Sequence, residues 1–461
     1  MSSGKTISIL ILLFSISFAK AQEVEQSLPE KTRILFLFDA SGSMLAPWGN
    51  QLRIDAAKEI LSDLVDSLRI NSKVELALRA YGHLSPAQQQ NCEDTKLEIP
   101  FSAGNHDAII QRLKYIYPKG TTPIAYSLEQ AANDFPTNHE YRNIIIIITD
   151  GIESCDGDPC EVSLALQKKR IFLKPFVIGL GMKAQFSQQF DCMGKYFNAK
   201  DINGFRTVLN GILNQSLSKT TASVELLDEN GRPVETNVNV SFINNFTGLS
   251  EFDFVHYRDT QGKPDTVEVD PVLTYDIIVN TIPPVVKRNI FLKGGTHNTI
   301  EIKSPQGALK INQRNSFEYD IPVTALIRQD KDPSILHTQA IESTEKYLMG
   351  TYDIELLTLP RINLQNVVLK QGDLLEIDIA SPGRVNITYS SNGIGSLYAI
   401  DENGRQELIK RINPKGQKIS FGIQPGNYKY VFRSDKALGS KYTQIKTFSI
   451  QSGATANIRI Y

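Results

Sequence analysis

Five consecutive isoleucines, residues 144–148, lead directly into Thr149-Asp150-Gly151 and restrict the possible folds more than any other segment of the chain. A strand of this composition is apolar on both of its faces, so both faces must be covered. Helices on the two sides of a mostly parallel sheet provide that cover. The run therefore predicts a buried parallel strand of an α/β domain, with a polar turn at its carboxyl end.

The surrounding segments alternate between the periods of strands and helices. Short apolar or alternating stretches predict further strands at 34–38, 74–78 and 171–178. Apolar residues at helical spacing predict helices at 52–68, 108–116, 123–135, 161–169 and 201–217. We therefore expect residues 33–218 to form a Rossmann-like α/β domain, in which ligands bind beyond the carboxyl ends of the strands.

After Thr220 the helical patterns end, and short alternating strands with Gly, Asn and Pro turns follow. Similar pentads contain Tyr275, Tyr352 and Tyr428, which are 352 − 275 = 77 and 428 − 352 = 76 residues apart. A glycine precedes the second strand after each pentad (Gly295, Gly372 and Gly453), and the turn Asp228–Arg232 recurs as Asp401–Arg405. This repetition predicts all-β, sandwich-like repeats, with modules at 221–306, 307–382 and 383–461.

The first residues have the pattern of a secretory signal peptide. A lysine near the start is followed by the apolar run 7–18 and by small residues at Ala19 and Ala21, which predicts a signal peptide over 1–21 and a mature chain that starts at Gln22. No later stretch is long and apolar enough for a membrane span, which needs about 20 apolar residues. We expect an exported protein of the periplasm, the outer cell envelope or the extracellular space.

Composition restricts the classes of partner. Lys plus Arg number 49 and Asp plus Glu number 50, a net charge of −1, so the chain lacks the general positive field that favours nucleic acid. The cysteines Cys92, Cys155, Cys160 and Cys192 predict two disulfides in an oxidising compartment. Four cysteines allow three pairings, and the sequence alone does not choose among them.

Polar side chains lie in three loops of the predicted α/β domain, two of them at the ends of predicted strands. The strand at 34–38 ends in Asp39-Ala40-Ser41-Gly42-Ser43, the isoleucine run ends at Asp150, and Thr122 precedes the helix at 123–135. With Pro123 as the first helical residue, Thr122 is expected to be the N-cap. We predict that these loops share one edge of the sheet, where five side chains supply oxygen ligands: Asp39, Ser41, Ser43, Thr122 and Asp150. Hard cations such as Mg²⁺ prefer oxygen ligands of this kind.

The sequence contains no phosphate-cradling glycine-rich loop, no G-x-S-x-G and no HExxH motif. A catalytic Mg²⁺ normally lies beside a phosphate site, a base or a nucleophile. We therefore expect a binding protein, not an enzyme.

These residues resemble the von Willebrand factor type A family, specifically its metal-ion-dependent adhesion site. Residues 39–43 fit D-x-S-x-S, Thr122 fits the threonine of the second loop, with Thr121 as the other possibility, and Asp150 fits the aspartate of the third. The resemblance implies a six-stranded sheet, a bound Mg²⁺ (or Mn²⁺ or Ca²⁺) and a protein partner that presents a carboxylate to the ion. Exported bacterial members look especially similar through residues 81–83, Cys92 and residues 153–160.

We further hypothesise that Cys92 pairs with Cys155 and Cys160 with Cys192, so that the bridges staple the loops beside the metal site. Other candidates have two interpretations each: His83 lines the site or is structural, Asp156 and Asp158 bind Ca²⁺ or form a polar turn, and Trp48 contacts a partner or packs on the next helix. Two other functions remain open: a cell-envelope scaffold in which the metal only stabilises a loop, and a Mg²⁺-dependent hydrolase.

Overall fold

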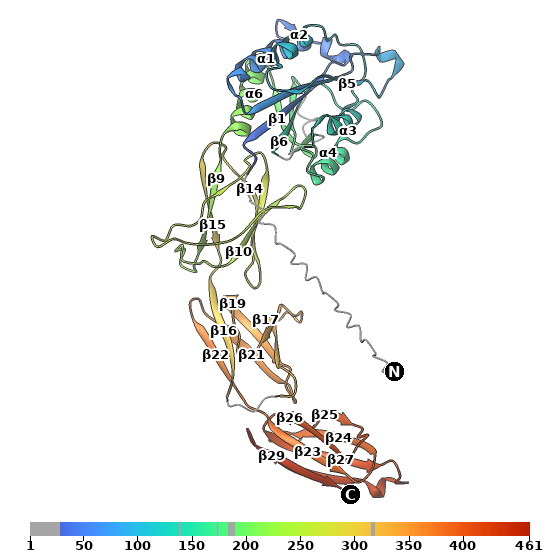
Figure 1. Ribbon diagram of the computed structural model, residues 1–461, viewed down its shortest axis with the longest axis vertical. Coiled ribbons are helices and arrows are strands. Elements are labelled where there is room, and N and C mark those ends of the chain that lie inside the picture. The colour runs from blue at the N-terminus through green and yellow to red at the C-terminus, as the bar shows by residue number, and fades with distance from the viewer. Residues whose placement is uncertain (1–27, 138–139, 173, 183–189, 315–318) are drawn as a thin grey trace, which may run out of the picture.

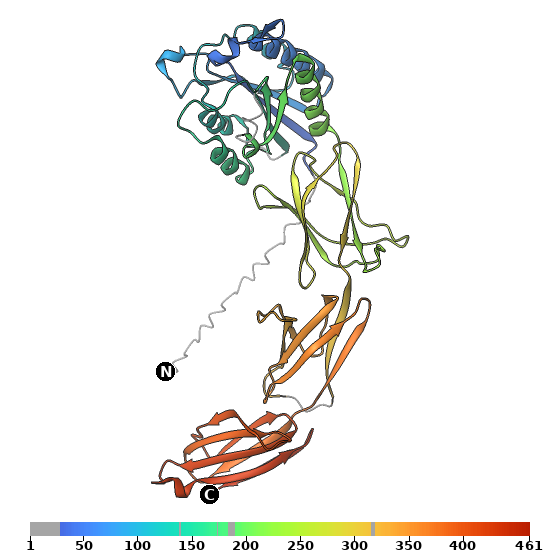
Figure 2. The same cartoon turned by 180° about the vertical axis from the view of Figure 1, so that it is seen from behind.

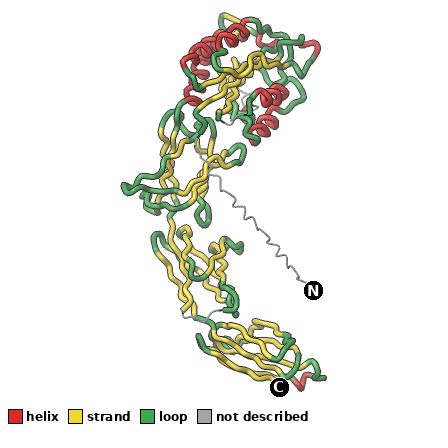
Figure 3. Tube along the Cα trace, in the orientation of Figure 1, coloured by secondary structure: helices red, strands yellow, loops and turns green. Residues whose placement is uncertain are grey.

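The computed structural model describes residues 28–137, 140–172, 174–182, 190–314 and 319–461. The predicted signal peptide lies outside the described residues. Figures 1 and 2 show an α/β domain at one end of an elongated molecule, followed by three β-sandwiches placed end to end. Figure 3 shows that the helices gather in the first domain, apart from the short 3-10 turn Ser440–Tyr442. In the described residues, no helix is long and apolar enough to cross a membrane.

The first domain contains a six-stranded sheet in the order β5-β4-β1-β6-β7-β8. All neighbouring strands are parallel except β4 and β5, which are antiparallel. The strands are β1 (Lys31–Asp39), β4 (Val74–Tyr81), β5 (Thr95–Ser102), β6 (Tyr141–Thr149), β7 (Phe176–Leu180) and β8 (Lys195–Ala199). The predicted mostly parallel α/β sheet is therefore confirmed.

The isoleucine run fills both cores of this domain. Ile144, Ile146 and Ile148 of β6 point into one apolar core, and Ile145 and Ile147 point into the other. Figure 1 shows two groups of helices on opposite sides of the sheet. One group is α1 (Arg53–Ser67), α2 (His106–Lys114) and α6 (Ile202–Leu217), and the other is α3 (Ile124–Asp134) and α4 (Pro159–Lys168).

The structure corrects the sequence prediction at several elements. The strand expected at 171–178 is β7, which starts at Phe176 because Pro175 before it has no N–H to donate to a ladder. Helix α2 begins and ends two residues earlier than predicted, and α4 begins at Pro159, with Asp158 as its N-cap. The strands β5 and β8 were not predicted as segments, nor was the short hairpin of β2 (Pro47–Trp48) and β3 (Gln51–Leu52).

Each β-sandwich has seven strands in the described residues and the same topology. The first contains β9 (Thr221–Leu227), β10 (Asn239–Asn244), β11 (Ser250–Val255), β12 (Val267–Glu268), β13 (Thr274–Val279), β14 (Val285–Phe291) and β15 (His297–Lys303). The second contains β16 (Gln306–Arg314), β17 (Thr324–Gln329), β18 (His337–Ala340), β19 (Thr344–Leu348), β20 (Gly350–Leu356), β21 (Ile362–Leu369) and β22 (Leu374–Ala380). The third contains β23 (Gly383–Tyr389), β24 (Gly393–Ile400), β25 (Gln406–Ile412), β26 (Lys418–Ile423), β27 (Gly426–Ser434), β28 (Gln444–Ile450) and β29 (Thr455–Ile460).

In every sandwich the first strand pairs antiparallel with the fourth and parallel with the seventh, and the other four strands form the second sheet. The tyrosines that revealed the repeat are equivalent. The hydroxyl groups of Tyr275, Tyr352 and Tyr428 donate to the backbone oxygens of Asp270, Leu348 and Gln424 at 2.9, 2.6 and 2.6 Å. Each closes a tyrosine corner of the kind found in sandwiches.

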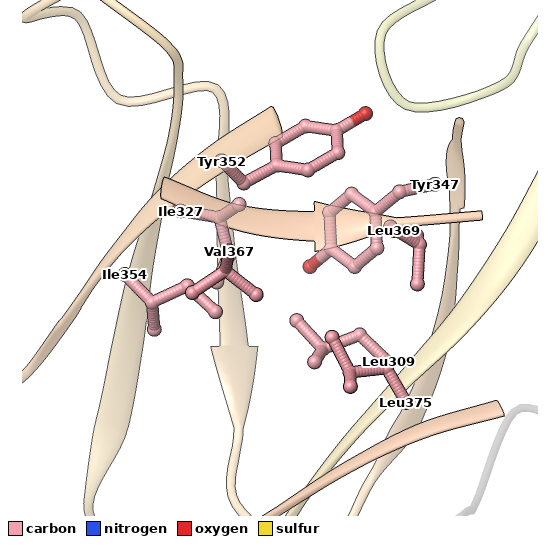
Figure 4. A pocket seen from close by; sticks show the side chains of 8 residues that line it. All are labelled: Leu309, Ile327, Tyr347, Tyr352, Ile354, Val367, Leu369 and Leu375. Atoms are coloured by element: carbon pink, nitrogen blue, oxygen red, sulfur yellow. The ribbon is translucent and has the colours of Figure 1, made fainter. Parts of the chain in front are cut away.

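The sandwiches have separate apolar cores. Figure 4 shows a void in the second sandwich, where Tyr347 and Tyr352 face Leu309, Ile327, Ile354, Val367, Leu369 and Leu375. Its free volume is about 10 Å³, at the lower limit for one water molecule, so this void is a packing defect and not a ligand site.

A buried ion pair joins the first domain to the first sandwich. Arg142, near the start of β6, donates from Nε to Asp270 Oδ2 at 2.8 Å and from Nη1 to the backbone oxygen of Ser216 at 2.6 Å. The side chains of Arg142 and Asp270 are only 10% and 2% exposed. Because Asp270 also belongs to the tyrosine corner of the sandwich, one arginine connects β6, the last turn of α6 and the sandwich.

Candidate metal centre

The two aspartates of the predicted site end neighbouring strands. Asp39 is the last residue of β1, and Asp150 directly follows β6. The two strands run parallel with Phe38 opposite Ile148, so both carboxylates reach the same edge of the sheet. Asp39 is fully buried and Asp150 is 8% exposed.

Backbone contacts fasten the first loop to the second. Gly42 N donates to Gly120 O at 2.9 Å, and Gly120 N donates to Gly82 O at 2.8 Å. Gly82 has a φ of +71°, and a Cβ there would lie 2.5 Å from the backbone oxygen of Thr121 and 2.8 Å from Cα of Ser41. A glycine is therefore required at this position, because any side chain would push the two loops apart.

The hydroxyl groups converge in front of the third loop. Ser41 Oγ lies 2.9 Å from Ser43 Oγ, and Ser43 Oγ donates to Asp150 Oδ1 at 2.7 Å. An added Cβ on Gly151 would lie 3.7 Å from Ser43 Oγ and 3.8 Å from Thr122 Oγ1, so both hydroxyls face the same small space. Asp39 lies behind them, where its carboxylate accepts from Ser41 N at 2.8 Å and from Thr149 Oγ1 at 2.6 Å. The structure thus brings all five predicted side chains to one rim.

The second loop shows which threonine faces this space. Thr121 Oγ1 donates to the backbone oxygen of Asn91 at 2.9 Å and is therefore turned toward the Cys92 loop. Thr122 is placed through its backbone, since its N–H donates to Ser154 Oγ at 2.7 Å. This geometry favours Thr122 as the ligand.

The expectation that Thr122 caps α3 is wrong. Pro123 is the N-cap of α3, and the Glu153 carboxylate accepts from Ala125 N at 2.7 Å and from Cys155 N at 2.9 Å. The carboxylate satisfies helix N–H groups that the cap leaves open, a favourable place for a negative charge. Burial raises the pKa of Glu153. This role of Glu153 was not predicted, because Thr122 offered itself as the cap and no local pattern marks a carboxylate that lies 28 residues from Ala125.

Disulfides hold the loops beside the site. Cys92 is bonded to Cys155 and Cys160 to Cys192, the pairing of our hypothesis. The first bridge connects the loop that receives Thr121 to the segment that follows Asp150. It therefore restrains the loops that carry Thr122 and Asp150 relative to each other.

Replacing Cys92 and Cys155 together by serine is expected to lower the free energy of unfolding by about 2–4 kcal/mol, because the unfolded chain gains freedom. It is also expected to weaken Mg²⁺ binding, because the Thr121 anchor loosens. The matched control replaces Cys160 and Cys192 by serine, which should cost similar stability and leave the Mg²⁺ affinity near that of the wild type. Denaturation and calorimetric titration measure the two effects, and an equal loss of Mg²⁺ affinity in both variants would refute the special role of the first bridge.

The charges of the site favour a cation. Burial, and next the negative charge of Asp150, raise the pKa of Asp39 to about 6. Arg53 Nη1 lies 2.7 Å from Asp150 Oδ2, and the Asp150 side chain is fully buried. The rim therefore holds two carboxylates that repel each other, with a single guanidinium in direct contact with one of them.

The residues fit a hard divalent ion. Two carboxylates and three hydroxyls gather at this rim, and Mg²⁺ prefers such oxygen donors with some water retained. Within the described ranges, no group of three or more His, Cys, Asp or Glu side chains is arranged to hold a metal. A centre at this rim thus depends on its hydroxyls as much as on its carboxylates.

The other candidates have structural roles. His83 is 5% exposed, and its Nε2 lies 2.8 Å from Glu98 Oε1. Asp158 accepts from the N–H groups of Cys160 and Glu161 as the N-cap of α4. Trp48 donates to the backbone oxygen of Lys200 at 3.1 Å and packs against Phe205 of α6, not only against the next helix.

Residues 34–210 match the family model of the von Willebrand factor type A domain. The matched part covers under half of the chain and corresponds to the six-stranded domain that carries the rim.

Known proteins are similar to parts of this chain. The uncharacterized protein YwmC of Bacillus subtilis (strain 168) is 28% identical over 199 residues, which cover 41% of this chain and 86% of YwmC. The structure of the conserved hypothetical protein BatB from Bacteroides thetaiotaomicron is 20% identical and covers 39% of this chain and 95% of BatB, with a TM-score of 0.32. The pilus adhesin SpaC from Lactobacillus rhamnosus GG is 9% identical and covers 94% of this chain and 83% of SpaC, with a TM-score of 0.35. Both scores are too low to support a functional inference.

Proposed function

We propose that this is an exported, metal-dependent binding protein. Its type A domain holds one divalent ion, Mg²⁺ or else Mn²⁺ or Ca²⁺, through Asp39, Ser41, Ser43, Thr122 and Asp150. When bound, the ion supplies an electrophilic centre for an acidic group of a protein partner. The sandwiches at 221–306, 307–382 and 383–461 form a stalk that carries the domain.

The observation that carries the proposal is the convergence of three hydroxyls and two carboxylates at an open rim. Ser43 is exposed, whereas Asp39 lies at the bottom of the site. The two carboxylates carry two negative charges, Arg53 beside Asp150 carries one positive charge, and the hydroxyls add none. The bound ion therefore keeps enough positive charge to attract a carboxylate from a partner.

Two features support export. Both disulfides are of the kind that persists in oxidising compartments, and residues 1–21 have the pattern of a signal peptide. We place the protein in the periplasm, in the outer cell envelope or outside the cell.

The test is capture of a partner from envelope and culture fractions on the immobilised mature protein, with Mg²⁺ or with EDTA. We expect one or more proteins, identified by mass spectrometry, to be retained with Mg²⁺ and released by EDTA. The purified partner should then lose binding when one of its exposed acidic residues is replaced by the corresponding amide. A partner that stays bound in EDTA would refute metal-dependent binding and favour the scaffold function.

A further inference from the structure

Arg53 is an unexpected part of the metal rim. Its Nη1 lies 2.7 Å from Asp150 Oδ2, while the other oxygen of the same carboxylate accepts from Ser43 Oγ at 2.7 Å. Both oxygens of Asp150 therefore have protein partners. The Asp150 side chain is fully buried and that of Arg53 is 21% exposed, so water screens this ion pair much less than a surface pair.

The fold builds a place for this arginine. The hairpin of β2 and β3 turns the chain back from the first metal loop, and Arg53 N donates to the backbone oxygen of Ala46 at 3.0 Å at the start of α1. At the end of β7, a Cβ on Gly181 would lie 2.9 Å from Trp48 Nε1 and 3.8 Å from Arg53 Nη2. Gly181, with a φ of +64°, thus leaves room for both side chains. Packing against these segments therefore sets the position of the Arg53 side chain.

We infer that Arg53 is a built-in counterion of the metal centre, which lowers its affinity for divalent cations and leaves the bound ion more open to an outside carboxylate. This inference rests on the proposed function and adds a residue that sets the strength of the site. Asp39 and Asp150 together carry two negative charges, and the guanidinium cancels one of them. A cation that enters the rim is attracted by a smaller net charge and is repelled by a neighbouring positive charge in a poorly screened place.

The experiment compares full-length wild type with Arg53→Gln and Arg53→Lys by calorimetric titration of Mg²⁺ into the metal-free proteins. Arg53→Gln should bind Mg²⁺ at least about tenfold more tightly, as expected for removing a nearby like charge. Arg53→Lys keeps the charge and should stay within about threefold of the wild type. The matched control is Arg206→Gln, since Arg206 pairs with Asp63 at 2.7 Å on the exposed surface of the same domain and should not affect Mg²⁺ binding.

The melting temperature distinguishes a counterion from a residue that only supports the fold. Without metal, Arg53→Gln leaves the buried Asp150 charge without its cation, so the melting temperature in EDTA should fall. Mg²⁺ should restore it, which makes the difference between Mg²⁺ and EDTA larger than in the wild type. Loss of a residue that only supports the fold would lower the melting temperatures in Mg²⁺ and in EDTA by the same amount.

The titrations test the role of Arg53 separately from the existence of the metal centre. Equal or weaker Mg²⁺ binding by Arg53→Gln, while the wild type binds normally, overturns the role of Arg53 and leaves the metal centre in place. No binding by either protein overturns the proposed metal centre and this inference together.

Discussion

Replacing Asp39 by asparagine is expected to abolish Mg²⁺ binding and, at the same time, to stabilise the metal-free protein at neutral pH. Mg²⁺ binding should be lost because the centre has only two carboxylates, and Asn leaves one. The fold should accommodate Asn, because the asparagine oxygen can still accept the hydrogen bond from Ser41 N. The asparagine amide can donate to Thr149 Oγ1, which in the wild type donates to Asp39. The Thr149 hydroxyl can then donate to Gly151 O, which lies 3.0 Å from it.

The gain in stability follows from the raised pKa of Asp39. The carboxyl has an ordinary pKa of 3.8 and a pKa of about 6 in the fold, because of its burial and of Asp150 nearby. The folded form thus holds this proton more tightly than the unfolded chain. The protonated Asp39 carboxyl therefore stabilises the fold fully below pH about 4, and this stabilisation is lost as the pH rises through about 6. At neutral pH the metal-free wild type should therefore be less stable than Asp39→Asn by on the order of 2–3 kcal/mol.

Urea denaturation of both proteins in EDTA, from pH 4 to pH 8, measures this difference. The difference between the two free energies of unfolding should grow as the pH rises and reach a plateau near pH 7. Mg²⁺ should stabilise only the wild type. A variant that still binds Mg²⁺ as the wild type does would show that the site is elsewhere.

Replacing Asp270 by asparagine is expected to destabilise the junction between the first domain and the first sandwich by about 3–5 kcal/mol. The change leaves the Arg142 guanidinium buried without its counterion, and breaking a buried pair on one side costs this much. Val272 N donates to Asp270 Oδ1 at 2.9 Å, and the asparagine oxygen can still accept this hydrogen bond. The loss of stability therefore measures the effect of removing the negative charge.

The matched control is Asp63→Asn, which breaks an exposed pair with Arg206 in the same domain. That change should cost no more than about 1 kcal/mol. Urea denaturation followed by far-ultraviolet circular dichroism reports mainly on the first domain, where the α-helices of the described residues lie. Similar losses for Asp270→Asn and Asp63→Asn would contradict the assigned role of the Arg142–Asp270 pair.

The site residues show how far sequence reasoning reaches. The carboxyl ends of parallel strands meet at one edge of a sheet, so the positions of Asp39 and Asp150 in sequence were enough to predict that they are neighbours. The structure agrees with this placement, while metal binding itself stays a prediction. Arg53 and Glu153 were not predicted, because each acts on a segment about 30 to 100 residues away and no local pattern marks such a partner.

Local periodicity determined the fold class and the repetition of this protein. Residues that alternate between two faces must find two cores, which is why the isoleucine run required helices on both sides of a sheet. Tyrosines at a constant interval marked equivalent corners, because the same turn must be closed in each sandwich. Only the tertiary structure decided the edge strands, the cap of α3, the counterion of Asp150 and the ion pair at the junction. These depend on distant segments that come together once the cores are packed, and the energy of a buried charge depends on what surrounds it, not on its neighbours in the sequence.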